Sequence, residues 1–127
     1  MNIKNKILIY LLLISSNATC QNISIECEGI ETIIALGMED KTKKKKEIYH
    51  FKNGLLYGNL STNWFENSII VEIPSIEING TIFSRYITFD RILGTVFDHT
   101  KASIKNQQDI FFNFDGSCNK SLNLKKF

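Results

Sequence analysis

The chain of 127 residues is long enough for one domain, and its 15 Lys plus Arg against 13 Asp plus Glu give a formal charge of +2. Without Lys4 and Lys6, which lie in a segment that we expect to be removed, 13 charges of each sign remain. Nucleic-acid binding needs a net basic domain or stripe, so this balance argues against that class of function and we expect no nucleic-acid partner.

The first 20 residues have the pattern of a secretory signal peptide. Lys4 and Lys6 form a basic start, residues 7–14 are an unbroken apolar run, and residues 15–20 are small or polar. A membrane-spanning helix needs about 20 apolar residues, so the remaining alternative is a buried helix of the fold. We expect a signal peptide at residues 1–20, one β-rich domain at residues 21–127, and an exported protein that is periplasmic or secreted.

Cys20 lies at the end of this segment, and three kinds of processing are open to it. Cleavage after Cys20 removes it, and cleavage after Ala18 leaves it as a thiol near a free end. Lipoprotein processing would acylate Cys20, although Asn17 and Thr19 stand where that signal normally has Leu and a small residue. A lipid-anchored envelope form is therefore the minority alternative, and only this form implies a membrane partner.

Two of these routes leave Cys27 and Cys118 as a pair near the two ends of the domain. A lone pair in an oxidising compartment is expected to form a disulfide, and the alternative is two unrelated buried thiols. The bridge would close a loop of 91 residues, for which the chain-entropy model gives about 4–5 kcal/mol.

Short apolar runs with period-2 alternation follow one another along the domain and predict β-strands. Gly29 separates the first two runs, and residues 38–47 are strongly charged and predict an exposed loop. Asn53-Gly54 and Asn79-Gly80 are hairpin signals, and Pro74 shifts the alternation, which predicts a bulge. Residues 99–108 are polar and predict a loop or a short helix, and the tail after Cys118 is expected to fray. The expected strands are residues 23–28, 30–36, 48–51, 55–60, 69–78, 81–89, 95–97 and 110–114.

About eight short strands with regular turn signals are typical of an all-β fold, and we expect a single antiparallel small barrel or sandwich. Unpaired edge strands need protection, which favours the barrel.

No catalytic or metal-binding constellation is evident. The two histidines, His50 and His99, have no cysteine partner at zinc-ligand spacing, so we expect no metal and no cofactor. Asp98-His99 places an acid beside a histidine, but no nucleophile elbow accompanies it. The prediction is that the protein is not an enzyme, with a small hydrolase as an alternative.

Two surface features allow a binding function. The lysines at residues 43–46 could attract anionic head groups, but Glu39, Asp40 and Glu47 lie beside them, which favours a solvated hairpin loop. Trp64, Phe65 and Tyr86 could form an exposed aromatic patch, against the default of core packing.

Two short motifs, Asp90-Arg91-x-x-Gly94 after an apolar strand and Gly116-x-Cys118 near the end, carry a resemblance. The chain resembles a loose group of uncharacterised small exported bacterial proteins, which implies a β-rich exported fold and no specific activity. Asp90, Arg91 and Gly94 are expected to fix a strand-turn junction. The small periplasmic lysozyme-inhibitor barrels share size, compartment and disulfide use, but their signature loop is not evident here.

These observations favour a non-enzymatic binding or interaction module of the cell envelope, whose partner could be an envelope protein or a glycan. The alternatives are a membrane-anchored structural lipoprotein, because of Cys20, and a small hydrolase, because of His99 and Asp98.

Overall fold

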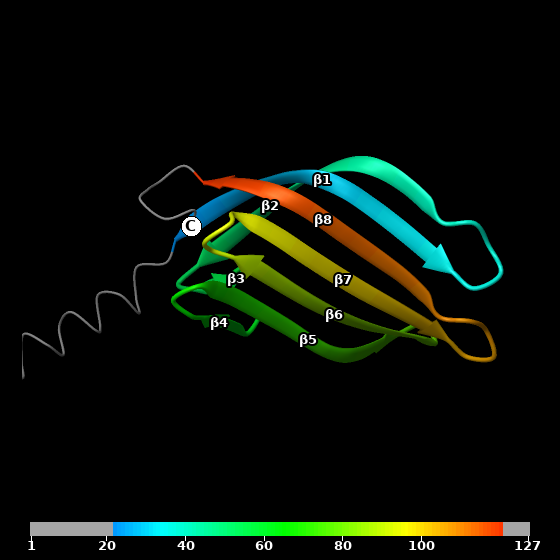
Figure 1. Ribbon diagram of the computed structural model, residues 1–127. Coiled ribbons are helices and arrows are strands. Elements are labelled where there is room, and N and C mark those ends of the chain that lie inside the picture. The colour runs from blue at the N-terminus through cyan, green and yellow to red at the C-terminus, as the bar shows by residue number, and fades with distance from the viewer. Residues whose placement is uncertain (1–21, 121–127) are drawn as a thin grey trace, which may run out of the picture.

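The computed structural model describes residues 22–120, which form one antiparallel sheet of eight strands in the order β3-β2-β1-β8-β7-β6-β5-β4 (Figure 1). This arrangement confirms the expected all-β fold. The strands are β1 Ile23–Ala35, β2 Lys41–Lys52, β3 Leu55–Leu56, β4 Thr62–Trp64, β5 Ser68–Ile78, β6 Thr81–Asp90, β7 Thr95–Ile104 and β8 Ile110–Lys120.

The sheet curls into a nearly closed barrel. Strands that follow one another in sequence are neighbours except β3 and β4, and β8 returns to pair with β1. At the gap between β3 and β4, a bridge joins Leu56 to Leu60 and the Leu56 amide donates to Thr62 Oγ1 (3.0 Å). Trp64 Nε1 donates to the Gly54 carbonyl across the same gap (2.7 Å). The two short edge strands are therefore held together at one end of the barrel.

The turns follow the local sequence signals. Asn53, Gly54, Asn79 and Gly80 all have positive φ, as a two-residue hairpin turn with a right-handed strand twist requires. The pairing of β5 with β6 shifts register between Ile73 and Ile76, on either side of Pro74. The bulge expected at Pro74 is therefore confirmed, because proline cannot donate to the ladder there.

Several sequence-based boundaries are wrong. The strand expected at residues 55–60 ends at Leu56, and β4 was not expected. Gly29 does not interrupt a strand, because β1 runs through it, and a Cβ at Gly29 would lie 1.8 Å from the Asp115 carbonyl oxygen. Residues 41–47 belong to β2 and not to a loop, since the lysines of this stretch pair with acids of β1. Residues 99–104 likewise continue β7, where alternation goes on with polar side chains.

The apolar core fills one half of the barrel interior. Its fully buried members come from β1, β2, β3, β5 and β6, with the rings of Tyr49 and Phe89 meeting edge to face at 5.0 Å. Cys27 and Cys118 lie directly opposite each other on β1 and β8 and form the expected disulfide. The disulfide joins β1 and β8, the first and last strands in sequence, and it is compatible with an oxidising location.

The junction between β6 and β7 is a tight turn. The Asp90 carboxylate accepts hydrogen bonds from the amides of Ile92 and Leu93, both at 2.9 Å, and Gly94 has φ +71°. Arg91 donates from its side chain to the Phe65 carbonyl, and its guanidinium lies over the Trp64 ring at 5.7 Å. These contacts attach the turn to the loop between β4 and β5.

Candidate functional sites inside and outside the barrel

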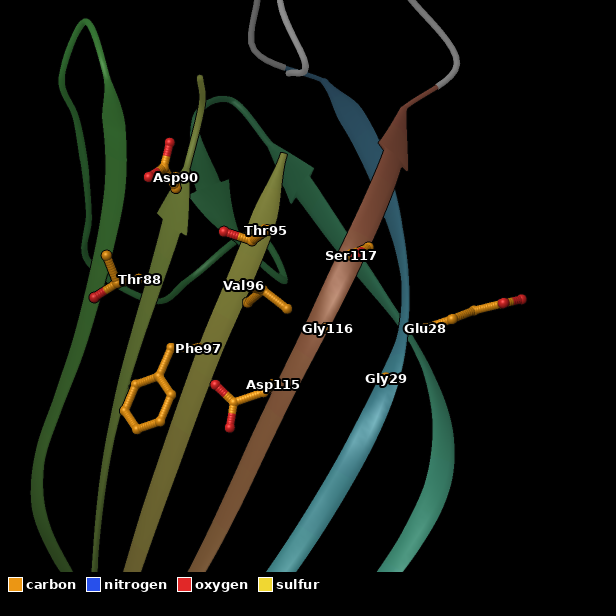
Figure 2. A pocket seen from close by; sticks show the side chains of 10 residues that line it. All are labelled: Glu28, Gly29, Thr88, Asp90, Thr95, Val96, Phe97, Asp115, Gly116 and Ser117. Atoms are coloured by element: carbon orange, nitrogen blue, oxygen red, sulfur yellow. The ribbon is translucent and has the colours of Figure 1, made fainter. Parts of the chain in front are cut away.

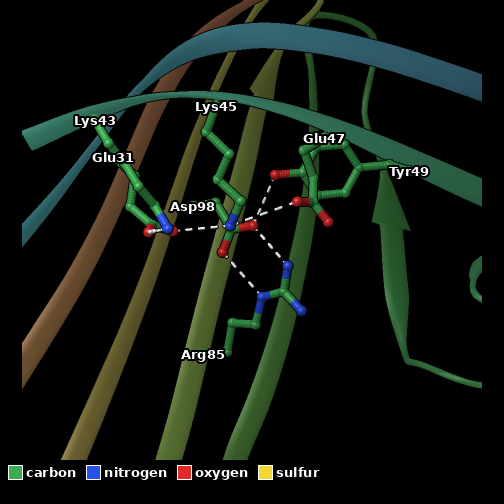
Figure 3. A network of polar contacts seen from close by, with 7 residues as sticks. All are labelled: Glu31, Lys43, Lys45, Glu47, Tyr49, Arg85 and Asp98. Carbon is green, nitrogen blue, oxygen red and sulfur yellow. Dashed lines mark hydrogen bonds and ion pairs between the residues drawn. The ribbon is translucent and has the colours of Figure 1, made fainter.

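The other half of the barrel interior is polar. Strand alternation that points Ile25 and Cys27 inward also points Glu31 inward, farther along β1. The same alternation brings inward side chains from β2, β6 and β7 toward it. A cavity of about 300 Å³ is lined by Glu31, Lys45, Glu47, Arg85, Asp98, Thr100, Phe112 and Phe114. Its charged residues, together with Lys43 and Tyr49, which contact Glu31 and Asp98, form what we call the interior charged cluster (Figure 3): Glu31, Lys43, Lys45, Glu47, Tyr49, Arg85 and Asp98.

Glu31 is the acid at the β1 side of this cluster, and its side chain is only 11% exposed. Lys45 donates to Glu31 Oε2 at 2.8 Å, Lys43 lies 3.3 Å from Oε1, and Lys45 also approaches Glu47 at 3.5 Å. The hydrogen bond from Lys45 is the main reason that the pKa of Glu31 is lowered, against the opposing effect of burial. Burial lowers the pKa of Lys45, but the contacts with Glu31 and Glu47 outweigh it and leave that pKa raised.

Asp98 is the second buried acid, and its contacts cross the barrel. Arg85 Nε and one terminal nitrogen donate to its two carboxylate oxygens at 2.9 and 2.6 Å, and Tyr49 donates its hydroxyl to Oδ2 at 2.7 Å. Since β1 and β8 separate β2 from β7 in the sheet, the bond from Tyr49 to Asp98 spans the interior. Burial and the neighbouring Asp98 charge raise the pKa of Tyr49, and the hydrogen bonds to Asp98 raise the pKa of Arg85 despite burial.

The interior charged cluster is therefore a satisfied network. Among the described residues, no buried side-chain nitrogen or oxygen lacks a hydrogen-bond partner. Three acids face three bases within it, so its formal charge is zero. Satisfied buried pairs of this kind join elements and specify an arrangement of strands, and we read this cluster as a structural connection across the barrel.

The structure separates the two residues on which a hydrolase could be based. Asp98 points into the barrel, while His99, its neighbour on β7, points outward and contacts Asn113 Oδ1 through Nδ1. Adjacent strand residues face opposite sides of a sheet, so Asp98 does not orient His99. Within residues 22–120, no group of three or more His, Cys, Asp or Glu side chains is arranged to hold a metal ion.

The outer face of β6, β7 and β8 carries a row of aromatic side chains, which we call the outer aromatic strip: Tyr86, Phe97, His99 and Phe111. The His99 ring lies between the rings of Phe97 (centroids 6.0 Å apart, planes at 16°) and Phe111 (5.6 Å, 29°). Tyr86 is directly opposite His99 on β6. Phe97 and Tyr86 remain 40% and 39% exposed, so the fold itself does not bury this strip.

A hollow of about 530 Å³, the outer hollow, adjoins the strip at Phe97 (Figure 2). In the figure the Asp115 side chain extends toward β7, whereas Glu28 points away from it on β1. Asp115 is exposed, and its carboxylate makes no hydrogen bond or ion pair with the described residues. The side chains around the outer hollow are those of Glu28, Thr88, Asp90, Thr95, Phe97, Asp115 and Ser117.

The other surface candidates are arranged differently from the sequence-based expectation. Lys43 and Lys45 lie on the inner side of β2 and pair with Glu31, although Lys43 stays 63% exposed. Lys46 pairs on the outside with Glu26 at 2.6 Å and Glu28 at 3.4 Å. The lysine run is therefore divided between two faces of β2, and Lys43, Lys45 and Lys46 are each paired with an acid of β1.

The aromatic patch expected from Trp64, Phe65 and Tyr86 is not formed. The Trp64 ring packs against Phe51 at 5.2 Å beside the core, while Tyr86 lies on the outer face of β6. Phe65 is 52% exposed in the loop between β4 and β5.

No family model matches the chain, and neither the curated proteins nor the solved structures contain a significant match to it. Over residues 22–120, no helix is long and apolar enough to cross a membrane. Cys20 and the expected signal peptide lie outside the described residues.

Of the residues on the outer face, the sequence analysis singled out Tyr86, as part of an aromatic patch with Trp64 and Phe65, and His99, as part of a hydrolase pair. It did not bring Phe97, Phe111 or Asp115 into a site. The expected strand at residues 95–97 ended too early. A strand that continued through His99 would have placed Phe97 and His99 on the same face.

Proposed function

We propose that this protein is an exported, disulfide-bonded, non-enzymatic binding module of the cell envelope, and that it binds its partner with the outer face of β6, β7 and β8. The observation that carries the proposal is the outer aromatic strip. Soluble proteins seldom leave a contiguous apolar surface exposed without a use for it, and here three stacked rings lie on the outside of a barrel that has its own core.

Three further features support this reading. The disulfide between Cys27 and Cys118 suits an oxidising compartment. The polar interior is occupied by paired charges, which leaves the outside as the surface with unpaired groups. Asp98 and His99 lie on opposite faces, so the feature that motivated a hydrolase is gone.

The test is co-sedimentation of the protein, purified as its host processes it, with the host's envelope fraction. Phe97→Ser removes an outward ring from the strip, and Phe65→Ser removes a comparably exposed ring far from it along the chain. We expect Phe97→Ser to reduce sedimentation severalfold and Phe65→Ser to leave it unchanged, with equal thermal unfolding temperatures for both variants. Equal sedimentation by Phe97→Ser and the parent protein would refute the proposal.

The anchored alternative rests on Cys20. The intact mass of the envelope-derived protein distinguishes the lipid-anchored form from the unanchored form. An acylated Cys20 adds the mass of fatty acids, whereas a start at Gln21 or Thr19 does not. An acylated protein would sediment through its lipid regardless of Phe97, and the variant comparison would then be repeated after detergent extraction.

A further inference from the structure

The outer hollow differs chemically from the aromatic strip that it adjoins. Its lining combines one ring face, Phe97, with hydroxyl groups and carboxylates. Thr95 and Ser117 are directly opposite each other on β7 and β8, and Phe97 and Asp115 form the next outward pair on the same two strands. Hydroxyl and carboxylate groups therefore lie beside an exposed ring within two rows of the sheet (Figure 2).

We infer that the outer hollow and the strip together bind a glycan chain of neutral or amino-bearing sugars. This inference rests on the proposed function and names the partner of the same face. A sugar ring presents an apolar face of C–H groups and a rim of hydroxyls, so it is bound by an aromatic ring beneath it and by hydrogen-bond acceptors at its edge. Phe97 and Asp115 supply this combination side by side.

The carboxylates of the hollow can accept further hydrogen bonds. The Asp115 carboxylate is exposed and has no hydrogen-bond or ion-pair partner among residues 22–120, and a carboxylate can accept several hydrogen bonds. Asp90 contributes less, since one of its oxygens already accepts from the amides of Ile92 and Leu93. Hydrogen bonds from sugar hydroxyls to an ionised acceptor are stronger than those between neutral groups, which makes Asp115 the main polar contact.

Charge decides which sugars fit. The carboxylates of Asp90 and Asp115 lie at the hollow, whereas Glu28 points away and pairs with Lys46 at 3.4 Å; among the described residues no Lys or Arg lines the hollow. Phosphorylated, sulfated and acidic sugars, and anionic lipid head groups, would meet like charge there. Neutral sugars meet no such penalty, and a free amino group would gain an opposite charge.

The strip explains why a chain suits the surface better than a single sugar. From Phe97 the rings continue to His99 and then to Phe111 on β8, so more than one sugar can lie on a ring. An extended peptide is less suited, because β7 is paired with β6 and β8 on its two sides and offers no free edge for an added strand.

The probes for the test are a tetramer of β-1,4-linked N-acetylglucosamine, its deacetylated tetramer and a heparin fragment, each titrated calorimetrically into the purified protein. We expect the two tetramers to bind and the heparin fragment not to bind. The deacetylated tetramer should bind more tightly at low salt and lose that advantage at high salt.

Two variants with matched controls locate the site. Phe97→Ser should weaken binding of both tetramers roughly threefold to tenfold, in line with the loss of one stacked ring, and Phe65→Ser should not change it. Asp115→Asn should remove the preference for the amino-bearing tetramer, whereas Asp40→Asn, in the turn between β1 and β2, should retain it.

The outcomes separate this inference from the proposed function. If Phe97→Ser abolishes envelope sedimentation but neither tetramer binds, the glycan inference is wrong and another partner occupies the strip. If the heparin fragment binds more tightly than the tetramers, the charge argument is wrong. If sedimentation itself is independent of Phe97, the proposed function fails together with the inference.

Discussion

Replacing Asp98 with alanine gives the sharpest test of the interior charged cluster. Asp98 is 8% exposed and accepts three hydrogen bonds, two from Arg85 and one from Tyr49. Its removal leaves a guanidinium in the barrel without its counter-ion, and breaking a buried pair in this way costs about 3–5 kcal/mol. Because the Arg85 side chain keeps 27% exposure to water, we expect the lower end, about 3 kcal/mol.

Equilibrium unfolding in urea measures this loss. With an m-value of about 1–2 kcal/mol per M for a domain of this size, the midpoint should fall by about 1.5–3 M. Tyr49→Phe removes only the hydroxyl that crosses the barrel, and we expect it to cost about 1.5–2 kcal/mol, because that hydroxyl bonds to a charged acceptor.

The double variant Asp98→Ala/Arg85→Met decides between a paired charge and simple packing. It leaves no unpaired ion, so it should be more stable than Asp98→Ala alone. If the losses in free energy of unfolding of the two single variants instead add in the double variant, the cluster does not connect the strands as we argue. The same conclusion follows if Asp98→Ala costs no more than about 0.5 kcal/mol, as a substitution at an exposed position would.

Three further predictions concern the same barrel. Cys27→Ser/Cys118→Ser should lower the free energy of unfolding by about 4–5 kcal/mol, because the bridge closes a loop of 91 residues; an unchanged urea midpoint would contradict this. The pKa of Glu31 is lowered from its ordinary value of 4.5, mainly by the hydrogen bond from Lys45, so its contribution is present above pH 4.5 and lost as the pH falls through its lowered pKa. Glu31→Gln should therefore flatten the acid side of a stability-against-pH profile measured between pH 3 and 7, and an identical profile would show that the ion pair contributes nothing. Gly29→Ala should cost about 3 kcal/mol or prevent folding, since its Cβ meets the Asp115 carbonyl oxygen; normal thermal unfolding of this variant would show that β1 and β8 can separate locally at little cost.

The sequence was sufficient for the fold class because turn chemistry and period-2 alternation are local. Asn53-Gly54 and Asn79-Gly80 adopt the positive φ that their residue types favour, and Pro74 displaces the register as its missing amide requires. These signals give the antiparallel pairing of neighbours. The expected total of eight strands agrees with the structure only because two expected strands are one, β1, and the short strand β4 was not expected. The pairing of β8 with β1 joins segments far apart in the sequence, so local signals do not predict it. The cysteine pair near the two ends of the domain was the signal for it.

The missed strand segments share one physical cause. Residues 41–47 and 99–104 are polar, and polarity was taken as a sign of a solvated loop, although inward lysines can pair with acids of an adjacent strand. Glu31 on β1 was the available clue, because it falls on the inward side of an otherwise apolar alternation. A buried acid requires a partner, and the nearest source of partners was the lysine run.

Whether an inward charge or an outward ring carries the function depends on what each still lacks. The acids inside the barrel have their hydrogen-bond partners. If Arg85 left Asp98 to bind a ligand, the buried Asp98 carboxylate would lose its counter-ion, which costs free energy as described above. On the outside, the Phe97 ring is 40% exposed and the Asp115 carboxylate accepts no hydrogen bond from the described residues, so a partner can add contacts there without breaking any. This difference in cost is why we assign stability to the interior charged cluster and binding to the outer face.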